Sequence, residues 1–118
     1  MSSSEIEQLL REISGFLEQY GVDFWAEYVT ERADELQSAI LSQSNTSILY
    51  ALYTIKKMYG GMGSFGDIYI NPYAGHSIEI EQVSTVNRKF HELKTQLYGA
   101  VRDEIVSLQA QTDGDSTT

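Results

Sequence analysis

The sequence predicts an all-α domain that resembles a four-helix bundle, with a glycine-rich loop and room for a short β-hairpin between the third and fourth helices. Three observations support this fold. Apolar residues recur every three or four positions along most of the chain, which is the α-helical period. Four glycines fall within residues 60–66. The 118 residues include no cysteine, which excludes disulfides, thiolate metal sites and cysteine nucleophiles.

The first two predicted helices cover residues 4–20 and 22–41. The apolar stripe of the first contains Ile6, Leu9, Leu10, Ile13, Phe16, Leu17 and Tyr20. Ser4 and Glu7 have the spacing of a capping box, and Gly21 is typical of a helix end. The second stripe contains Phe24, Trp25, Tyr28, Val29, Leu36, Ala39 and Ile40, and Asp23 can cap its start.

The third predicted helix covers residues 47–59, with lysines in its last turn, where cations suit the helix dipole. The last covers residues 82–109, and at ~1.5 Å per residue it would be roughly 40 Å long. Residues 1–110 would then form a single helical domain. Residues 111–118 contain no apolar side chain and are expected to be a disordered tail.

The segment between the last two helices contains the predicted hairpin. Ile68 and Ile70 would share one face of an extended segment. Residues 71–75 read as a turn, and Ile78 and Ile80 alternate with polar residues after it. The two segments could therefore pair as short strands.

The net charge of −9 comes from 17 acidic and 8 basic residues. Residues 1–43 alone carry nine acids and two bases, a balance of −7. Such a domain is a poor nucleic-acid binder, because phosphate contact needs clustered Lys and Arg. The acidity suits a basic protein partner, or it serves solubility alone. The chain shows neither a secretory signal nor the roughly 18 apolar residues of a membrane helix, so we expect a cytoplasmic protein with no membrane contact.

The glycine loop fits G-x-G-x-x-G from Gly61 to Gly66, but its context differs from that of a dinucleotide fingerprint. That fingerprint follows a strand and opens a helix, whereas this loop follows a predicted helix and precedes an extended segment. We therefore expect a structural loop, built by Gly60, Gly61, Gly63 and Gly66. An anion nest of backbone N–H groups remains the alternative.

The polar residues near this loop do not assemble a recognisable catalytic or metal site. Asp67 can accept loop N–H bonds and fix the turn, or it can contact a ligand or a partner's cation. His76 and His91 lack metal-ligand spacing, so no metal or cofactor is expected. Ser64, His76 and Asp67 can be written as a triad, but nothing around Ser64 resembles a nucleophile elbow. The sequence therefore does not predict an enzyme.

Aromatic residues are numerous, with eight tyrosines and one tryptophan. Most are expected to pack in the core, but Tyr and Trp are also favoured anchors of binding surfaces. The candidate partner- or ligand-binding residues are Trp25, Tyr28, Ser64, Phe65, Asp67, Tyr69 and Tyr73.

Residues 60–67 resemble the Gly-Gly-Met-Gly-Ser-(Leu/Phe)-x-Asp signature of a family of small bacterial proteins of uncharacterised activity. Trp25-Ala26 and Asn87 are also similar, and the resemblance spans most of residues 5–101. Gly66 stands where the family pattern has Asn. Some relatives are encoded beside bacterial toxins, so the resemblance implies a toxin-immunity role.

These observations predict a non-enzymatic, bacterial protein-binding domain, whose most specific form is an immunity protein that covers a toxin's active site. The alternative is a small-molecule or enzymatic pocket that uses Asp67 and the loop N–H groups, with Trp25 or Tyr28 as walls. A homodimer formed through the last helix is a third possibility.

Overall fold

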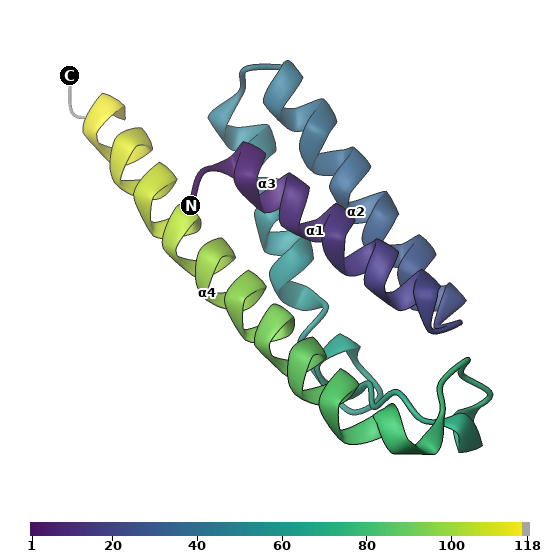
Figure 1. Ribbon diagram of the computed structural model, residues 1–118. Helices are drawn as coiled ribbons and strands as arrows, with labels where there is room; N and C mark the ends of the chain where they lie inside the picture. Colours follow the sequence, from purple (N-terminus) through teal and green to yellow (C-terminus); the bar gives the residue numbers. More distant parts are fainter. Residues whose placement is uncertain (117–118) are drawn as a thin grey trace.

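The computed structural model describes the backbone of residues 1–116 and the side chains of residues 1–111. Four helices account for most of this part of the chain: α1 (Ser3–Gln19), α2 (Asp23–Leu41), α3 (Asn45–Lys57) and α4 (Val83–Ser116). α1 packs against α2 and α4, and α3 packs against the same two helices (Figure 1). The all-α prediction is confirmed.

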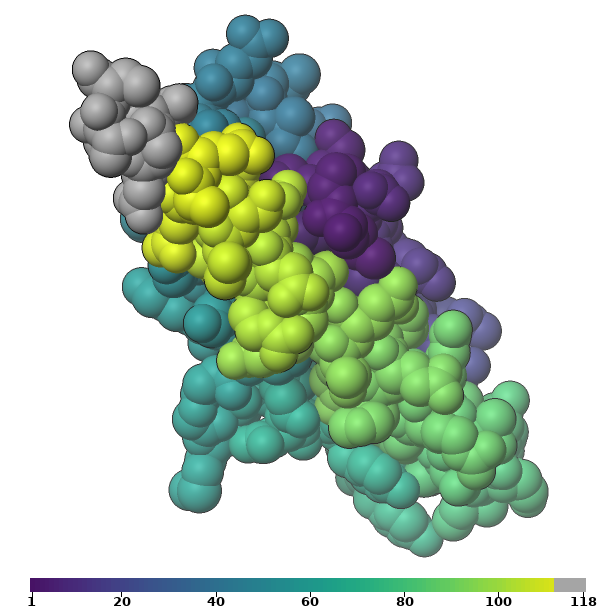
Figure 2. Space-filling model, turned by 90° about the vertical axis from the view of Figure 1, so that its left-hand side faces the viewer, coloured from purple at the N-terminus to yellow at the C-terminus, as the bar shows by residue number. Residues whose placement is uncertain are grey.

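α4 is the longest element and runs along the whole molecule. Its 34 residues correspond to about 50 Å, close to the longest molecular dimension of 58 Å. The space-filling view shows it from green to yellow, beside the teal end of α3 and the glycine loop (Figure 2). α4 continues to Ser116, so residues 111–116 of the tail predicted to be disordered are helical, and residues 117–118 lie outside the described residues.

The predicted hairpin is wrong. The described residues contain no strand between α3 and α4, but three short 3₁₀ helices: η1 (Phe65–Asp67), η2 (Pro72–Ala74) and η3 (Ile80–Gln82). The backbone groups of Ile70 that would have paired with a strand are taken by the side chain of Asn87 on α4. Ile70 N donates to Asn87 Oδ1 at 2.8 Å, and Asn87 Nδ2 donates to Ile70 O at 2.7 Å.

The start of α1 lies slightly earlier than the sequence indicated. Ser2, rather than Ser4, is the N-cap: Glu5 N donates to Ser2 Oγ, and Ser2 N donates to Glu5 Oε1. The helix ends as predicted, before Gly21, through a Schellman motif. Val22 N donates to Leu17 O at 2.9 Å, and Gly21 N donates to Glu18 O at 3.0 Å.

The core forms along the predicted apolar stripes, and every helix contributes fully buried side chains. These include Ile6, Leu10, Ile13, Leu17, Val29, Leu36, Leu52, Ile55, Phe90 and Leu97. Phe24 is the main exception. The sequence placed it in the stripe of α2, yet 72% of its surface is exposed.

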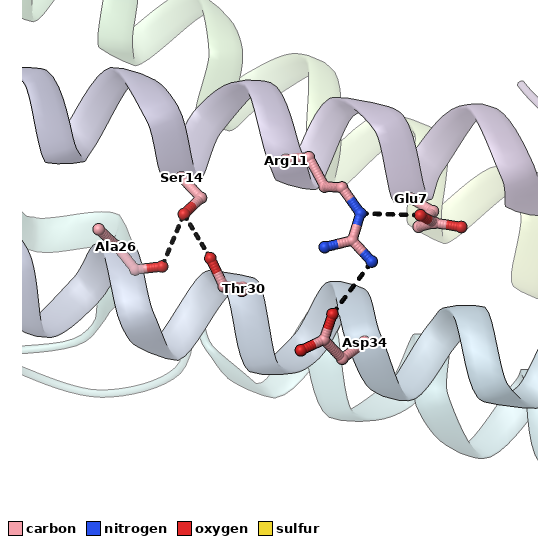
Figure 3. A network of polar contacts seen from close by, with 6 residues as sticks. All are labelled: Glu7, Arg11, Ser14, Ala26, Thr30 and Asp34. Carbon is pink, nitrogen blue, oxygen red and sulfur yellow. Dashed lines mark hydrogen bonds and ion pairs between the residues drawn. The ribbon is translucent and has the colours of Figure 1, made fainter.

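Polar contacts also join α1 to α2 (Figure 3). Ser14 Oγ donates to Ala26 O at 2.8 Å and lies 2.6 Å from Thr30 Oγ1. Because a hydroxyl carries one hydrogen, the Thr30 hydroxyl must be the donor in the second contact. Arg11 binds Glu7 on its own helix and Asp34 on α2, at 2.8 and 3.0 Å. Glu7 and Asp34 are therefore paired, and Arg32 of α2 pairs with Glu31 and Glu35.

We predict opposite stability changes for two glycine-to-alanine substitutions. Gly21 has φ +72°, and a Cβ there would lie 2.9 Å from Ser77 Oγ and 3.2 Å from Ser77 N. Gly21→Ala should therefore lower the free energy of unfolding by at least about 1–2 kcal/mol. Gly15 lies inside α1 with nothing within 4 Å of a Cβ, so Gly15→Ala should raise it by about 0.5–1 kcal/mol. Urea unfolding followed by circular dichroism measures both, and equal shifts would contradict the strain at Gly21.

Candidate functional site

The glycine loop after α3 is closed by its own residues. Gly61 and Gly63 have φ values of +84° and +73°, a conformation that glycine adopts without strain. Gly63 N donates to Asp67 Oδ2 at 3.0 Å, and Phe65 N donates back to Met58 O at 2.9 Å. Asp67 therefore fixes the turn with its carboxylate.

Phe65 leads the loop back into the core. It is fully buried, and its ring centroid lies 5.8 Å from that of Trp25, 5.3 Å from that of Tyr59 and 5.8 Å from that of Phe90. Ser64 is also buried, and its Oγ has no hydrogen-bond partner among the described residues. These two candidate binding residues thus lie beneath the surface, and Trp25 is half-buried against Phe65.

Lys94 of α4 holds the outer side of the loop. Its Nζ donates to Gly66 O at 3.1 Å and to Ile68 O at 3.2 Å, and lies 4.4 Å from the centroid of the Phe90 ring. Burial lowers the pKa of Lys94, and the charge of Asp67 acts in the opposite direction. Lys94 could not be identified from the sequence, because helical spacing does not distinguish it from the exposed Lys89.

A surface pocket of about 430 Å³ opens beside this lysine. Its lining consists of Tyr59, Gly66, His91, Lys94, Thr95 and Tyr98. Tyr59 closes one side, where its hydroxyl donates to Lys94 O at 2.8 Å and its ring meets that of Tyr98 edge to face. Asp67, Trp25 and Tyr28 do not line this pocket, so the ligand site predicted from them is not formed here.

The stability of the protein should fall above pH 10 because of Tyr59. Burial, with a smaller contribution from Tyr98, raises the pKa of the Tyr59 phenol well above its ordinary value near 10. The phenol therefore ionises in the unfolded chain before it ionises in the folded one. The unfolded state binds fewer protons in that range, so stability is lost as the pH rises. Urea unfolding at pH 9, 10 and 11 should show this loss, and Tyr59→Phe should reduce its slope; an unchanged slope would contradict the assignment.

The outward side of α2, together with Glu18 near the end of α1, presents a second candidate site, which we call the acidic aromatic face. It consists of Glu18, Asp23, Phe24, Glu27, Tyr28 and Glu31. The ring centroid of the exposed Phe24 lies 5.5 Å from that of Trp25 and 6.4 Å from that of Tyr28. The Arg32 guanidinium lies 4.5 Å from the centroid of the Tyr28 ring. An aromatic cluster thus reaches from the core to the surface here.

Two hollows flank Glu27 on this face. One, of about 360 Å³, lies between α1 and α2 and is lined by Ser14, Glu18, Asp23, Ala26, Glu27 and Thr30. The other, of about 180 Å³, is lined by Phe24, Glu27, Tyr28 and Glu31. Within residues 1–111, the carboxylates of Glu18, Asp23 and Glu27 form no ion pair. Their negative charge is therefore available to a partner.

Tyr69 and Tyr73, the remaining aromatic candidates, lie on the connection between α3 and α4. Their exposed fractions are 57% and 87%. Neither residue lines the pocket beside Lys94 or the two hollows on the acidic aromatic face. The structure therefore does not bring all the predicted binding residues together in one site.

The fold and these surfaces define a small all-α domain with a closed glycine corner. The chain belongs to a family described as a domain of unknown function (DUF6966), whose model matches residues 18–79. Comparisons with curated proteins and with solved structures gave no match. The matched segment includes the glycine loop and all of α2, but it ends before Asn87 and Lys94, which hold the loop and the connection to α4.

Proposed function

We propose that this chain is a non-enzymatic protein-binding domain whose acidic aromatic face binds a basic protein. In its most specific form, it would be an immunity protein that neutralises a bacterial toxin by direct binding. The observation that carries the proposal is the exposed Phe24 on a face where the carboxylates of Glu18, Asp23 and Glu27 lack ion-pair partners within residues 1–111. A surface aromatic side chain ringed by charge is suited to a partner with an apolar centre and a basic rim.

Burial of apolar surface and electrostatic attraction would both favour such an interface. Covering Phe24 would contribute about 1.5–3 kcal/mol, since most of its surface is exposed in the free protein. The balance of −7 over residues 1–43 would attract a basic partner and accelerate association at low salt. Added salt should weaken the affinity, because it screens the charge attraction, but it should not abolish binding, because the burial of Phe24 remains.

The geometry near the glycine loop supports a binding role over a hydrolytic one. Asp67 accepts a hydrogen bond from the loop itself. Nδ1 of His76 accepts from Asn71 N at 3.1 Å, so this nitrogen stabilises the connection. Ser64 is buried. Ser64 and Asp67 belong to the glycine loop and His76 to the connection after it, and no hydrogen bond joins their side chains among the described residues.

Co-production with a bacterial toxin, sought among the products of the neighbouring genes, tests the immunity proposal. A sensitive bacterium that makes the toxin should survive only when this chain is also made. Titration calorimetry with the purified toxin should then show at least tenfold weaker binding for Phe24→Ala and for Glu27→Gln. Death of the cells despite production of the folded chain would contradict the proposal.

Two variants provide matched controls for this surface. Tyr73→Ala removes an aromatic ring that is 87% exposed on the connection, and Glu12→Gln removes an exposed carboxylate from α1. Each should change the dissociation constant less than twofold. An equal loss in these controls would mean that the acidic aromatic face is not the binding surface.

The homodimer through α4 stays a separate prediction. α4 exposes Val106, which is 62% accessible. Multi-angle light scattering at high protein concentration decides whether the chain associates, and a monomer would remove this possibility.

A further inference from the structure

The pocket beside Lys94 presents polar side chains from a single face of α4. His91, Lys94, Thr95 and Tyr98 follow the spacing i, i+3, i+4, i+7, which places them on adjacent turns of one helix face. An imidazole, an ammonium group and two hydroxyls therefore border one hollow of about 430 Å³. Small-molecule sites commonly have volumes of about 300–1,000 Å³ and a few convergent polar groups.

Residues 56–102, which contain all the residues that line this pocket, include six basic and four acidic residues, a balance of +2. Six of the eight basic residues of the chain lie between positions 56 and 102: Lys56, Lys57, Arg88, Lys89, Lys94 and Arg102. In the described part of the chain, the first four form no ion pair. An anion would therefore meet less repulsion from this segment than from residues 1–43, whose balance is −7.

Lys94 has hydrogen-bonding capacity left for a ligand. An ammonium group has three N–H donors, and two of them are used by Gly66 O and Ile68 O. These two bonds fix Nζ at the pocket wall without neutralising its charge, since carbonyl oxygens carry no net charge. The third donor, together with the exposed Thr95 beside it, is available to an oxygen of a ligand.

The walls of the pocket favour a planar ligand. Tyr59 and Tyr98 meet edge to face with 5.1 Å between ring centroids. The Tyr59 hydroxyl is already bonded to the backbone of α4, which holds the pair in place. A further ring can pack against Tyr98, 37% of which is exposed.

We propose that this pocket binds a small aromatic carboxylate. Its carboxylate accepts hydrogen bonds from Lys94 Nζ and Thr95 Oγ1, and its ring packs against Tyr98. The pocket shares no residue with the acidic aromatic face. This site can therefore be tested independently of the protein-binding function proposed above.

Benzoate is the probe, and the measurement is its titration into the ¹⁵N-labelled protein by two-dimensional NMR. We expect saturable shifts of the amide signals of residues 91–98 and Gly66. Benzamide has the same shape without the charge and should bind at least tenfold more weakly, because a charged hydrogen bond is lost. Inorganic phosphate should not compete at equal concentration.

Three variants distinguish specific binding in the pocket from nonspecific attraction of anions by positive charge. Thr95→Val and Tyr98→Leu leave the lysine in place and should weaken benzoate binding at least fivefold. Lys89→Gln removes one exposed charge from the same helix and should change the affinity for benzoate less than twofold. Shifts that do not saturate, equal binding of phosphate, or an equal loss in Lys89→Gln would overturn the proposal.

Discussion

Replacing Phe65 with alanine will lower the free energy of unfolding by about 3–5 kcal/mol, the usual cost of removing a buried phenylalanine ring. Phe65 is fully buried and contacts aromatic rings of Trp25 on α2, Tyr59 just after α3 and Phe90 on α4. The cavity would open where the glycine loop joins these elements, so relaxation of one element alone could not fill it. Domains of this size are typically stable by about 5–15 kcal/mol, and the loss would be a large part of that.

Urea unfolding followed by circular dichroism and by Trp25 fluorescence measures this effect. Met62→Ala in the same loop is the matched control, because Met62 is 99% exposed and its replacement should change stability by no more than about 0.5 kcal/mol. A loss below about 1 kcal/mol in Phe65→Ala would contradict the central position of this ring.

The second large effect is expected for Asn87→Asp, a change of one atom. The Asn87 Nδ2 group donates to Ile70 O at 2.7 Å and to Val83 O at 2.8 Å. A carboxylate oxygen in its place would face two carbonyl oxygens without a hydrogen between them. We expect a loss of about 2–4 kcal/mol at pH 7, since two part-buried acceptors lose their donor and gain a repulsive neighbour.

Two comparisons isolate this effect. Gln96→Glu makes the same amide-to-carboxylate change at an exposed position of α4 and should alter stability by no more than about 0.5 kcal/mol. The deficit of Asn87→Asp should shrink as the pH falls toward about 4, because the carboxyl then becomes protonated and can donate to one of the two carbonyl oxygens. Equal losses in the two variants would show that charge on α4, and not the Asn87 contacts, is responsible.

The helices could be predicted from the sequence because their signal is local. Each apolar stripe repeats within a few residues, and the buried side chains follow it in all four helices. Local periodicity could not show whether the segment between α3 and α4 forms a hairpin. Ile68 and Ile70 alternate like strand residues, yet their backbone partners are side chains on α4, 17 and 26 positions away in sequence. Contacts at such separations leave no periodic trace in a single sequence.

The candidate sites, like the fold, could be predicted only where the signal in the sequence is local. The glycine positions predicted a structural corner, and the bond between Gly63 and Asp67 has that character. The aromatic residues could not be sorted, because burial depends on which way a helix or loop faces. Phe24 belonged to an apolar stripe and is exposed, whereas Phe65 belonged to a polar loop and is buried.

The pairing of Ile70 with Asn87 also predicts how this region opens. Amide protons outside regular secondary structure usually exchange quickly with solvent, but Ile70 N donates to a side chain anchored on α4 and the residue is fully buried. Its proton should exchange at a rate similar to that of amides in the first turns of α4, because both are released by the same opening event. The connection and the start of α4 would then separate from the rest of the molecule as one cooperative unit.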